Sequence, residues 1–271
     1  MSATMLTTRR IEKPWGRANL WPGFADPAPG AAPVGEIWFE APGDPELLVK
    51  YLFTSEKLSV QVHPDDDAAR ARGHARGKDE AWVILAAEPE STIALGTLAP
   101  MSADALRAAA LDGSIEQLLD WKPVKAGDVF YSPARTVHAI GAGITLVEVQ
   151  QNVDLTYRLY DYGRPRELHL EDAVAVSDPV PFAATGAVAD GADGRSILAQ
   201  GPKFVLERWR GGERELRLGD KPGWLVPLAG SGTADGTAWQ AGDCLMLAGD
   251  CRISASADAD LLIAYPGAEK L

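Results

Sequence analysis

Short runs in which apolar and polar positions alternate follow one another along most of the chain from residue 34 onward. This period of two is typical of strands that bury one face. Stretches rich in Pro, Gly, Asp and Ser separate the runs and favour turns. The strands predicted in the first half are 35–41, 46–53, 57–63, 79–87, 91–97, 128–133, 136–142, 144–151 and 154–162. Residues 79–87 and 91–97 are predicted to pair, and the turn at 141–143 predicts a tight hairpin.

Three segments depart from this pattern and predict short helices. Residues 101–121 have helical apolar spacing, with Ser102 as the N-cap and Gly113 dividing the segment in two. Residues 65–77 are charged and rich in Ala, which indicates a short exposed helix, and 169–178 predicts a closing helix. Residues 1–33 contain a stretch rich in Pro, Gly and Ala, which predicts an irregular arm.

The second half of the chain resembles a shortened repeat of the first. Residues 81–92 and 124–140 resemble 223–233 and 239–254, but the position matching His138 falls near Arg252, and no His or Glu matches the first copy elsewhere. Many short strands, repeated once, predict an all-β protein with two antiparallel barrels of sandwich or jelly-roll type, the second smaller and degenerate. We expect a first domain at 1–178 with a helical insert at 101–121, a linker at 179–200 and a C-terminal β domain at 201–271.

Composition narrows the partners that this fold would have. An apolar content of 46% over 271 residues can fill a core, and a net charge of −12 without a basic stripe argues against nucleic acid or an anionic membrane as partner. No signal-like segment or run of 18 apolar residues is found, so we expect a cytoplasmic protein. We also expect a monomer or a homodimer. Cys244 and Cys251 are expected to be buried free thiols.

Candidate metal ligands gather around the segment 58–85. Side chains alternate along a strand, so Gln61 and His63 share a face, and Glu80 is expected on the neighbouring strand and His138 on a later one. Imidazole with carboxylate or amide oxygens suits Zn²⁺, and also Fe²⁺, Mn²⁺, Co²⁺ or Ni²⁺. His74, in the charged 65–77 segment, and His169, before the closing helix, are interpreted as a surface residue and a cap or packing residue. Neither enters the predicted site.

Several segments together resemble the signature regions of type I mannose-6-phosphate isomerases, zinc enzymes of the cupin superfamily. The resemblance runs from about residue 13 to about residue 173, and the short bacterial form is the better comparison because only 101–121 could represent a helical domain. The segments are KPWG (13–16), GEIWFE (35–40), LSVQVHPDD (58–66), GKDEAWVIL (77–85), GDVFYSPARTVHAIGAGITLVEVQQ (127–151) and DLTYRLYDYGR (154–164).

The resemblance implies a fold, a cofactor and a set of site residues. It implies two cupin-type barrels and one Zn²⁺ per chain, with other divalent ions remaining open. The implied zinc ligands are Gln61, His63, Glu80 and His138. The implied substrate-binding residues are Ser59, Lys78 and Arg158, and the implied catalytic residues are Arg158, Lys78, Asp154 and Glu148.

The activity implied is the interconversion of mannose 6-phosphate and fructose 6-phosphate through a cis-enediol. Ring opening and transfer of a proton between C2 and C1 require acid–base groups and stabilisation of developing oxyanion charge. The group that moves the proton stays open between Lys78, Glu148, His63 and a water at the ion. Two other functions also stay open: another metal-dependent cupin enzyme such as an Fe²⁺ oxygenase, and a sugar-binding or regulatory cupin without turnover.

Simpler interpretations of the charged residues stay open as well. Arg158 could pair with Asp154 or Asp161 on a barrel surface, as strand charges often do. Glu148 could be a solvent-facing strand residue, and Lys78 an exposed residue of a turn.

Overall fold

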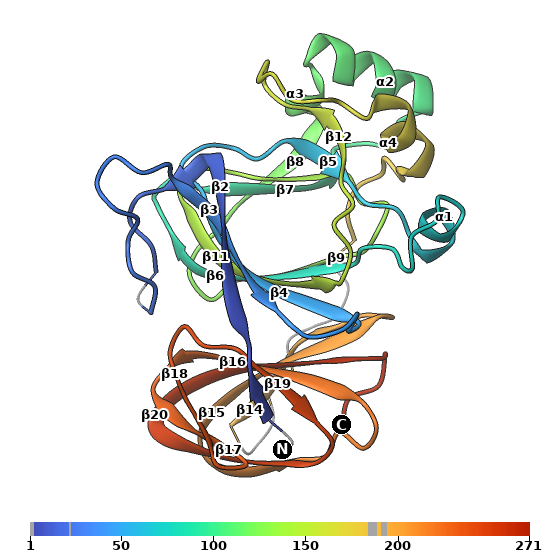
Figure 1. Ribbon diagram of the computed structural model, residues 1–271. Helices are drawn as coiled ribbons and strands as arrows, with labels where there is room; N and C mark the ends of the chain where they lie inside the picture. The colour runs from blue at the N-terminus through green and yellow to red at the C-terminus, as the bar shows by residue number, and fades with distance from the viewer. Residues whose placement is uncertain (1–2, 22, 184–188, 191–193) are drawn as a thin grey trace.

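The computed structural model describes residues 3–21, 23–183, 189–190 and 194–271. Three antiparallel sheets form two stacked β-units, and a few short helices lie at one end (Figure 1). The predicted all-β, cupin-like class is confirmed. In the described part of the chain, hydrogen bonds do not close these sheets into barrels.

A six-stranded sheet and a five-stranded sheet face each other in the first unit (Figure 1). The six-stranded sheet has the order β2 (Thr7–Arg17), β3 (Val34–Glu40), β4 (Leu47–Phe53), β11 (Ile144–Gln151), β6 (Glu80–Ala87) and β9 (Val129–Ser132). The five-stranded sheet has the order β12 (Tyr157–Tyr160), β5 (Val60–Val62), β10 (His138–Ile140), β7 (Thr92–Thr97) and β8 (Leu119–Pro123).

Two predicted strand pairings are wrong because the chain crosses between these sheets. β10 and β11 do not form a hairpin: β10 pairs with β5 and β7, and β11 pairs with β4 and β6. The turn at Gly141 instead passes so close to β7 that an added Cβ would lie 2.2 Å from the carbonyl oxygen of Thr92. Likewise β6 and β7 lie in different sheets, so their connection is also a crossing.

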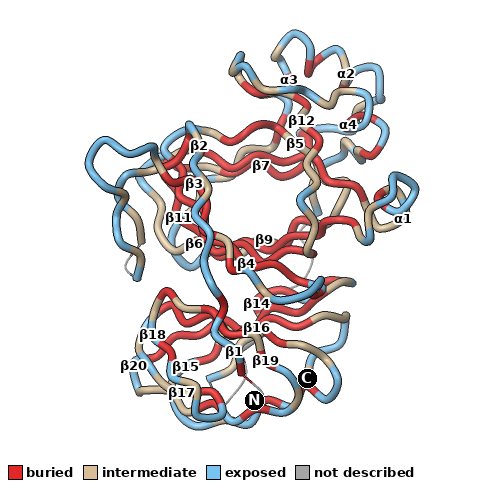
Figure 2. The backbone as a smooth tube through the Cα atoms, in the orientation of Figure 1, coloured by how far each residue is buried: buried red, intermediate tan, exposed pale blue. Residues whose placement is uncertain are grey.

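Side chains that alternate along the strands of the six-stranded sheet point toward two different spaces, one on each face of the sheet. On β11, Val147 and Val149 face the second unit, while Leu146 and Glu148 face the space between the two sheets of the first unit. β4 follows the same rule, with Tyr51 directed to the second unit. Both faces of these strands are therefore buried, as the red segments of Figure 2 show.

The second unit is one nine-stranded sheet with its own core. Its strands are β1 (Ala3–Met5), β13 (Ala189–Asp190), β14 (Arg195–Gln200), β15 (Phe204–Leu216), β16 (Pro222–Ala229), β17 (Ser231–Ala234), β18 (Thr237–Gln240), β19 (Leu245–Ala248) and β20 (Cys251–Pro266). Large side chains such as Trp209, Trp239 and Tyr265 fill its interior. Its other face packs on the six-stranded sheet through residues such as Leu206 and Val226.

The predicted irregular arm at 1–33 is wrong for much of its length. β1 pairs with β19 of the second unit and β2 pairs with β3 of the first, so the N-terminal segment joins both units (Figure 1). Alternating exposed and pocket-facing side chains on β2 explain why this polar segment can be a strand.

The predicted linker at 179–200 includes strand residues at its C-terminal end, because β14 pairs with β15. Residues 184–188 and 191–193 of that linker lie outside the described residues. The division into domains at 1–178, 179–200 and 201–271 stays a prediction.

Four short helices among the described residues lie beside the sheets of the first unit: α1 (Asp66–Arg70), α2 (Ala103–Asp112), α3 (Ile115–Leu118) and α4 (Leu170–Val176). α2 has Ser102 as its side-chain N-cap and ends at Gly113, whose φ is 81°. α1 is shorter than predicted, and residues 119–121 form part of β8 and not of a helix. α2, α3 and α4 pack on the outer face of the five-stranded sheet.

No helix among the described residues is long and apolar enough to span a membrane. Cys244 and Cys251 are both buried, as expected, and no disulfide joins them in the described part of the chain.

Candidate active site

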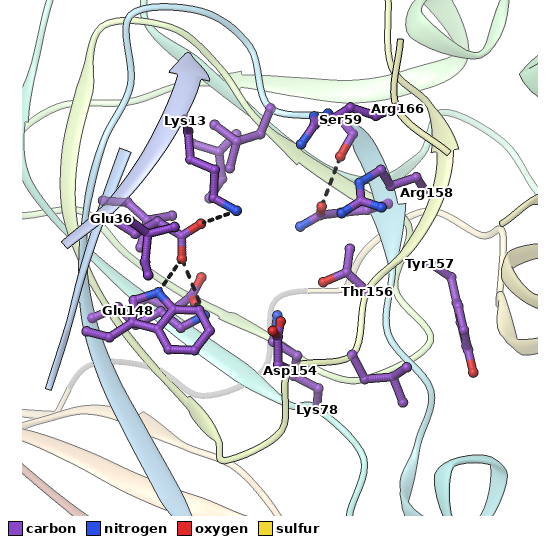
Figure 3. A pocket seen from close by; sticks show the side chains of 18 of the residues that line it. Lys13, Glu36, Ser59, Lys78, Glu148, Asp154, Thr156, Tyr157, Arg158 and Arg166 are labelled. Carbon is purple, nitrogen blue, oxygen red and sulfur yellow. Dashed lines mark hydrogen bonds and ion pairs between the residues drawn. The ribbon is translucent and has the colours of Figure 1, made fainter. Parts of the chain in front are cut away.

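A pocket of about 660 Å³ opens between the two sheets of the first unit (Figure 3). One wall comes from β2, β3, β4 and β11, and the opposite wall from β5, β12 and the segment before β12. In Figure 3, Lys13, Glu36 and Glu148 lie across the pocket from Ser59 and Arg158. The pocket is polar because inward strand positions that fill a core elsewhere in this fold carry charged side chains here.

A group of three ligand-type side chains lies in the interior beside this pocket. The ligand atoms of His63, Glu80 and His138 all lie within 4.8 Å of one another, and each residue is at most 2% exposed. His63 Nε2 is 2.9 Å from Glu80 Oε1, and His138 Nε2 is 3.8 Å from Glu80 Oε2. Glu80 was expected on the strand next to His63, but it reaches the group from the opposite sheet.

The imidazoles of His63 and His138 both direct an Nε2 lone pair into the space between the three ligand-type side chains. His63 Nδ1 lies 2.9 Å from the carbonyl oxygen of Leu155, and His138 Nδ1 lies 2.9 Å from that of Thr136. A carbonyl oxygen can only accept, so Nδ1–H is the donor in each case and Nε2 carries no proton when the ring is neutral. This orientation by a backbone carbonyl is typical of metal-binding histidines. Two lone pairs and a carboxylate directed at one point fit a divalent cation.

Burial sets the charge state of the same group. Desolvation and the nearby Lys78 ammonium lower the pKa of His63 to about 3, and desolvation also lowers the pKa of His138. Burial alone would raise the pKa of Glu80, but its neighbours, the Lys78 ammonium first among them, outweigh burial and lower this pKa well below its usual value. At neutral pH the group is therefore two neutral imidazoles and one carboxylate, a donor set that Zn²⁺ accepts.

Gln61 lies at the edge of the group. Its amide nitrogen is 3.2 Å from His138 Nε2, and its oxygen accepts a hydrogen bond of 3.1 Å from the Ser59 hydroxyl. Gln61 and His138 are register partners on β5 and β10, which explains how residues 77 positions apart meet. A half-turn of the amide would exchange its oxygen and nitrogen, so the residue is placed to offer either.

Lys78 joins the ligand group to the pocket. Its Nζ is 2.7 Å from Glu80 Oε1 and 3.2 Å from His63 Nε2, and the residue is 5% exposed while lining the pocket. The alternative of an exposed turn lysine is therefore wrong. Lys78 is the cation that faces the carboxylate here, and it is a compact point charge with protons to donate.

A second buried charge network forms the wall opposite Ser59. Glu148 accepts a hydrogen bond of 3.1 Å from Trp82 Nε1 and lies 3.3 Å from Lys50 Nζ, which is itself 3.7 Å from Glu36. Desolvation and Glu80 raise the pKa of Glu148. Glu148 is 4% exposed, so the alternative of a solvent-facing residue is wrong. Lys50 was not predicted as a site residue, although a lone lysine inside the apolar strand LLVKYLF indicates a buried partner.

Arginines line the pocket at the β12 side. Arg158 and Arg166 both line it, and among the described residues the Arg158 guanidinium has no hydrogen bond or ion pair, so the surface pair with Asp154 or Asp161 does not form. Arg166 is paired with Asp161 at 2.6 Å. Desolvation and the neighbouring Arg166 lower the pKa of Arg158. Asp154 also lines the pocket, but it precedes β12 and does not share a strand with Arg158.

The two histidines left out of the predicted site also lie at the pocket. His74 and His169 are among its lining residues, as is Arg72, which pairs with Asp172 at 3.0 Å. His74 is partly exposed where it lines the pocket, so the surface interpretation of this residue is not contradicted. His169 precedes α4, but its side chain makes no capping hydrogen bond. The helix pattern located His169 correctly, whereas its direction could not be read from the sequence.

The fold and the site together define a class: an all-β protein of cupin-like architecture with a buried His-Glu-His group suited to a metal ion. No family model matches the chain. Relatives with curated names point to a narrower class of protein. A mannose-6-phosphate isomerase of Streptococcus mutans is 38% identical over 173 residues, which are 60% of this chain and 54% of that protein. The mannose-6-phosphate isomerase ManA of Bacillus subtilis is 43% identical over 137 residues, 48% of this chain and 43% of that protein.

Solved structures agree over a greater length. The crystal structure of the Bacillus subtilis mannose 6-phosphate isomerase has a TM-score of 0.83 and 28% identity, and the match covers 97% of this chain and 99% of that chain. A zinc-bound mannose 6-phosphate isomerase shares the fold with a TM-score of 0.74 at 14% identity, covering 98% and 100%. The resemblance to mannose-6-phosphate isomerases is confirmed. The chain matches about half the length of the curated relatives.

Proposed function

We propose that this protein is a metal-dependent aldose–ketose isomerase that interconverts mannose 6-phosphate and fructose 6-phosphate through a cis-enediol. The observation that carries the proposal is the joining of two features at one pocket. A buried group of two imidazoles and one carboxylate lies behind Gln61 and Lys78, which line the pocket, and the positive charge of Arg158 has no ion-pair partner among the described residues. The relatives named as mannose-6-phosphate isomerases support the same assignment.

We propose that Gln61, His63, Glu80 and His138 hold one Zn²⁺ per chain. When bound, the ion would polarise the substrate oxygens at C1 and C2. Because three of the proposed ligands are neutral and only Glu80 is charged, the site would keep net positive charge. Support comes from the directed Nε2 lone pairs and the burial of all three ligand-type side chains.

We propose that the end of the pocket lined by Arg158 and Arg166 binds the phosphate group of the substrate. The Arg158 guanidinium has no hydrogen bond or ion pair with any residue that the structure describes, and its planar fork of donors matches phosphate oxygens or an enediolate oxygen. Arg166 adds positive charge beside it, although Asp161 partly neutralises that charge. Ser59, whose hydroxyl lines the same wall, is proposed to contact the substrate together with Lys78.

Proton transfer is proposed to use the buried acid–base residues at the pocket. Glu148 has a raised pKa and is held by Trp82 and Lys50, so it can accept a proton more readily than an exposed carboxylate. Lys78 can donate to a developing oxyanion, and Asp154 can assist ring opening from the pocket edge. The group that moves the C2 proton stays open between Lys78, Glu148, His63 and a water at the ion.

An assay coupled to fructose 6-phosphate formation tests this function. Protein as purified, protein treated with a chelator and chelated protein supplied with Zn²⁺ are compared with mannose 6-phosphate as substrate. We expect activity that disappears on chelation and returns with Zn²⁺. Stoichiometric metal without turnover in any of these states would instead favour a sugar-binding or oxygenase role.

A further inference from the structure

His169 meets the free edge of β12 at Arg158. β12 is the edge strand of the five-stranded sheet. The backbone N–H of His169 donates to the Arg158 carbonyl oxygen at 2.9 Å, and the backbone N–H of Arg158 donates to His169 Nδ1 at 3.3 Å. Backbone groups at a sheet edge otherwise lack protein partners. One residue therefore pairs both backbone groups of Arg158, as a neighbouring strand would.

The direction of the His169 ring follows from that contact. Nδ1 can accept the Arg158 N–H only when it carries no proton, so the neutral ring has its hydrogen on Nε2. The carbonyl oxygen of His169 accepts from Ala173 in the first turn of α4, which ties the residue to the helix. His169 thus connects α4, packed on the outer face of the sheet, with the backbone of a pocket residue.

No described residue holds the Arg158 guanidinium directly, so its placement depends on how the Arg158 backbone is held, by β5 on one side and by His169 on the other. Among the described residues the side chain has no hydrogen bond or ion pair, so its position follows from its own backbone and from the pocket wall. We propose that His169 is a positioning residue that sets the placement of Arg158 through Nδ1. The kinetic part of this proposal rests on the isomerase function proposed above.

Two substitutions separate Nδ1 from the rest of the histidine. The side-chain oxygen of Asn occupies the place of Nδ1, whereas the polar end of Gln corresponds to Nε2. We expect His169→Asn to keep kcat/KM within about threefold of the wild type and His169→Gln to lower it about tenfold, because a small misplacement of a binding group is costly. The loss in His169→Gln is expected in the same parameter, kcat or KM, that Arg158→Ala lowers most.

A double variant tests whether the effect passes through Arg158. In an Arg158→Ala background we expect His169→Gln to cause no further loss, since coupled residues are not additive. Equal activity of His169→Asn and His169→Gln, or a full additional loss in the double variant, would overturn the proposal.

Helix capping needs its own control, because Asn is also a good N-cap. His169→Ser caps well, but its hydroxyl is one bond shorter than Nδ1, so we expect a loss like that of His169→Gln. Retention of activity in His169→Ser would show that capping matters and the Arg158 contact does not. Melting temperature and bound metal are measured in each variant to exclude unfolding and metal loss.

Hydrogen exchange at the Arg158 amide is independent of activity and therefore separates this proposal from the isomerase function. We expect exchange at this amide to be faster in His169→Gln than in the wild type and in His169→Asn. Unchanged exchange in His169→Gln would contradict the proposal even if the protein proves to be an isomerase. Faster exchange would support the contact even if the wild type has no isomerase activity.

Discussion

The interiors of the two β-units are filled differently. Inward positions of the first unit carry Glu80, Glu148, Lys50 and His138 at or beside a pocket, whereas the interior of the second unit is filled mainly by large apolar side chains such as Trp239, with Glu207 buried among them. The units also share a core, formed by the outward positions of the six-stranded sheet and one face of the nine-stranded sheet. From this difference we expect the second unit to support the first, and the proposed chemistry to belong to the first unit.

Removing a proposed ligand should produce the largest effect. We expect His138→Ala to lose bound metal and to lower isomerase activity more than about a hundredfold, because transition-state charge stabilisation at the ion would be lost. Elemental analysis and the coupled assay measure the two losses. Arg252→Ala is the matched control, since Arg252 lies near the corresponding position of the second unit and is paired on the surface with Glu213. Full metal content in His138→Ala would sink the ligand assignment.

Removing the free guanidinium should reduce activity without unfolding the protein. We expect Arg158→Ala to lower kcat/KM about a hundredfold, as expected for loss of a charge-assisted contact to the substrate, while bound metal and melting temperature stay close to wild type. The kcat/KM of Arg158→Lys should lie between the values of the wild type and Arg158→Ala, because a lysine keeps the positive charge but cannot supply the bidentate fork. Wild-type kinetics in Arg158→Ala would remove this residue from the proposed mechanism.

Removing a large side chain from the core of the second unit should lower the stability of the protein. Trp239 is 3% exposed in that core, so Trp239→Ala should lower the free energy of unfolding by about 3–5 kcal/mol. Urea unfolding measures the change. The folded fraction should keep its bound metal and its turnover per active site. A variant that is equally stable but inactive would contradict the division of roles between the units.

Acid should weaken one contact between the units. Partial burial acts to raise the pKa of Asp66, but hydrogen bonds from Lys203, Gly77 and Gln151 outweigh it and lower the pKa to about 2. A carboxyl whose pKa is lowered on folding stabilises the protein fully above its unfolded value, and that contribution is lost as pH falls through the folded value.

The expected effect of Asp66→Asn is therefore small and pH-dependent. The stability difference from wild type should be largest above about pH 5 and should shrink as the pH falls from about 4 toward 2. Urea unfolding at several pH values measures the difference. Asp67→Asn is the control, because the Asp67 side chain is 98% exposed. A difference that grows on acidification would show that the sign is wrong.

The sequence predicted the elements better than it predicted their partners. Period-two alternation located most strands, because burial of one or both faces leaves a local pattern. The partners of β10 and β11 could not be predicted in this way, since a Gly-rich turn suits a hairpin and a crossing between sheets equally well. Gly141 is needed because the chain passes against Thr92, a contact that exists only in the folded protein.

The site was only partly within reach of the sequence for the same reason. His63, Glu80 and His138 were predicted as metal ligands, and the structure brings them together, yet Glu80 arrives from the opposite sheet. Lys50 and Arg166 were missed because their importance depends on which side chains they face across the pocket. His169 was located at the helix start, but its contact with Arg158 was not predicted, because that contact joins a helix start to a sheet edge.

Watching the substrate itself in D₂O tests the central claim most directly. Mannose 6-phosphate is incubated with the metal-loaded protein and followed by NMR. We predict that fructose 6-phosphate appears, that part of it carries deuterium at C1 from proton exchange at the enediol stage, and that both signals vanish on chelation. An unchanged substrate would contradict the isomerase account in favour of a sugar-binding protein, and an oxidised sugar would contradict it in favour of an oxygenase.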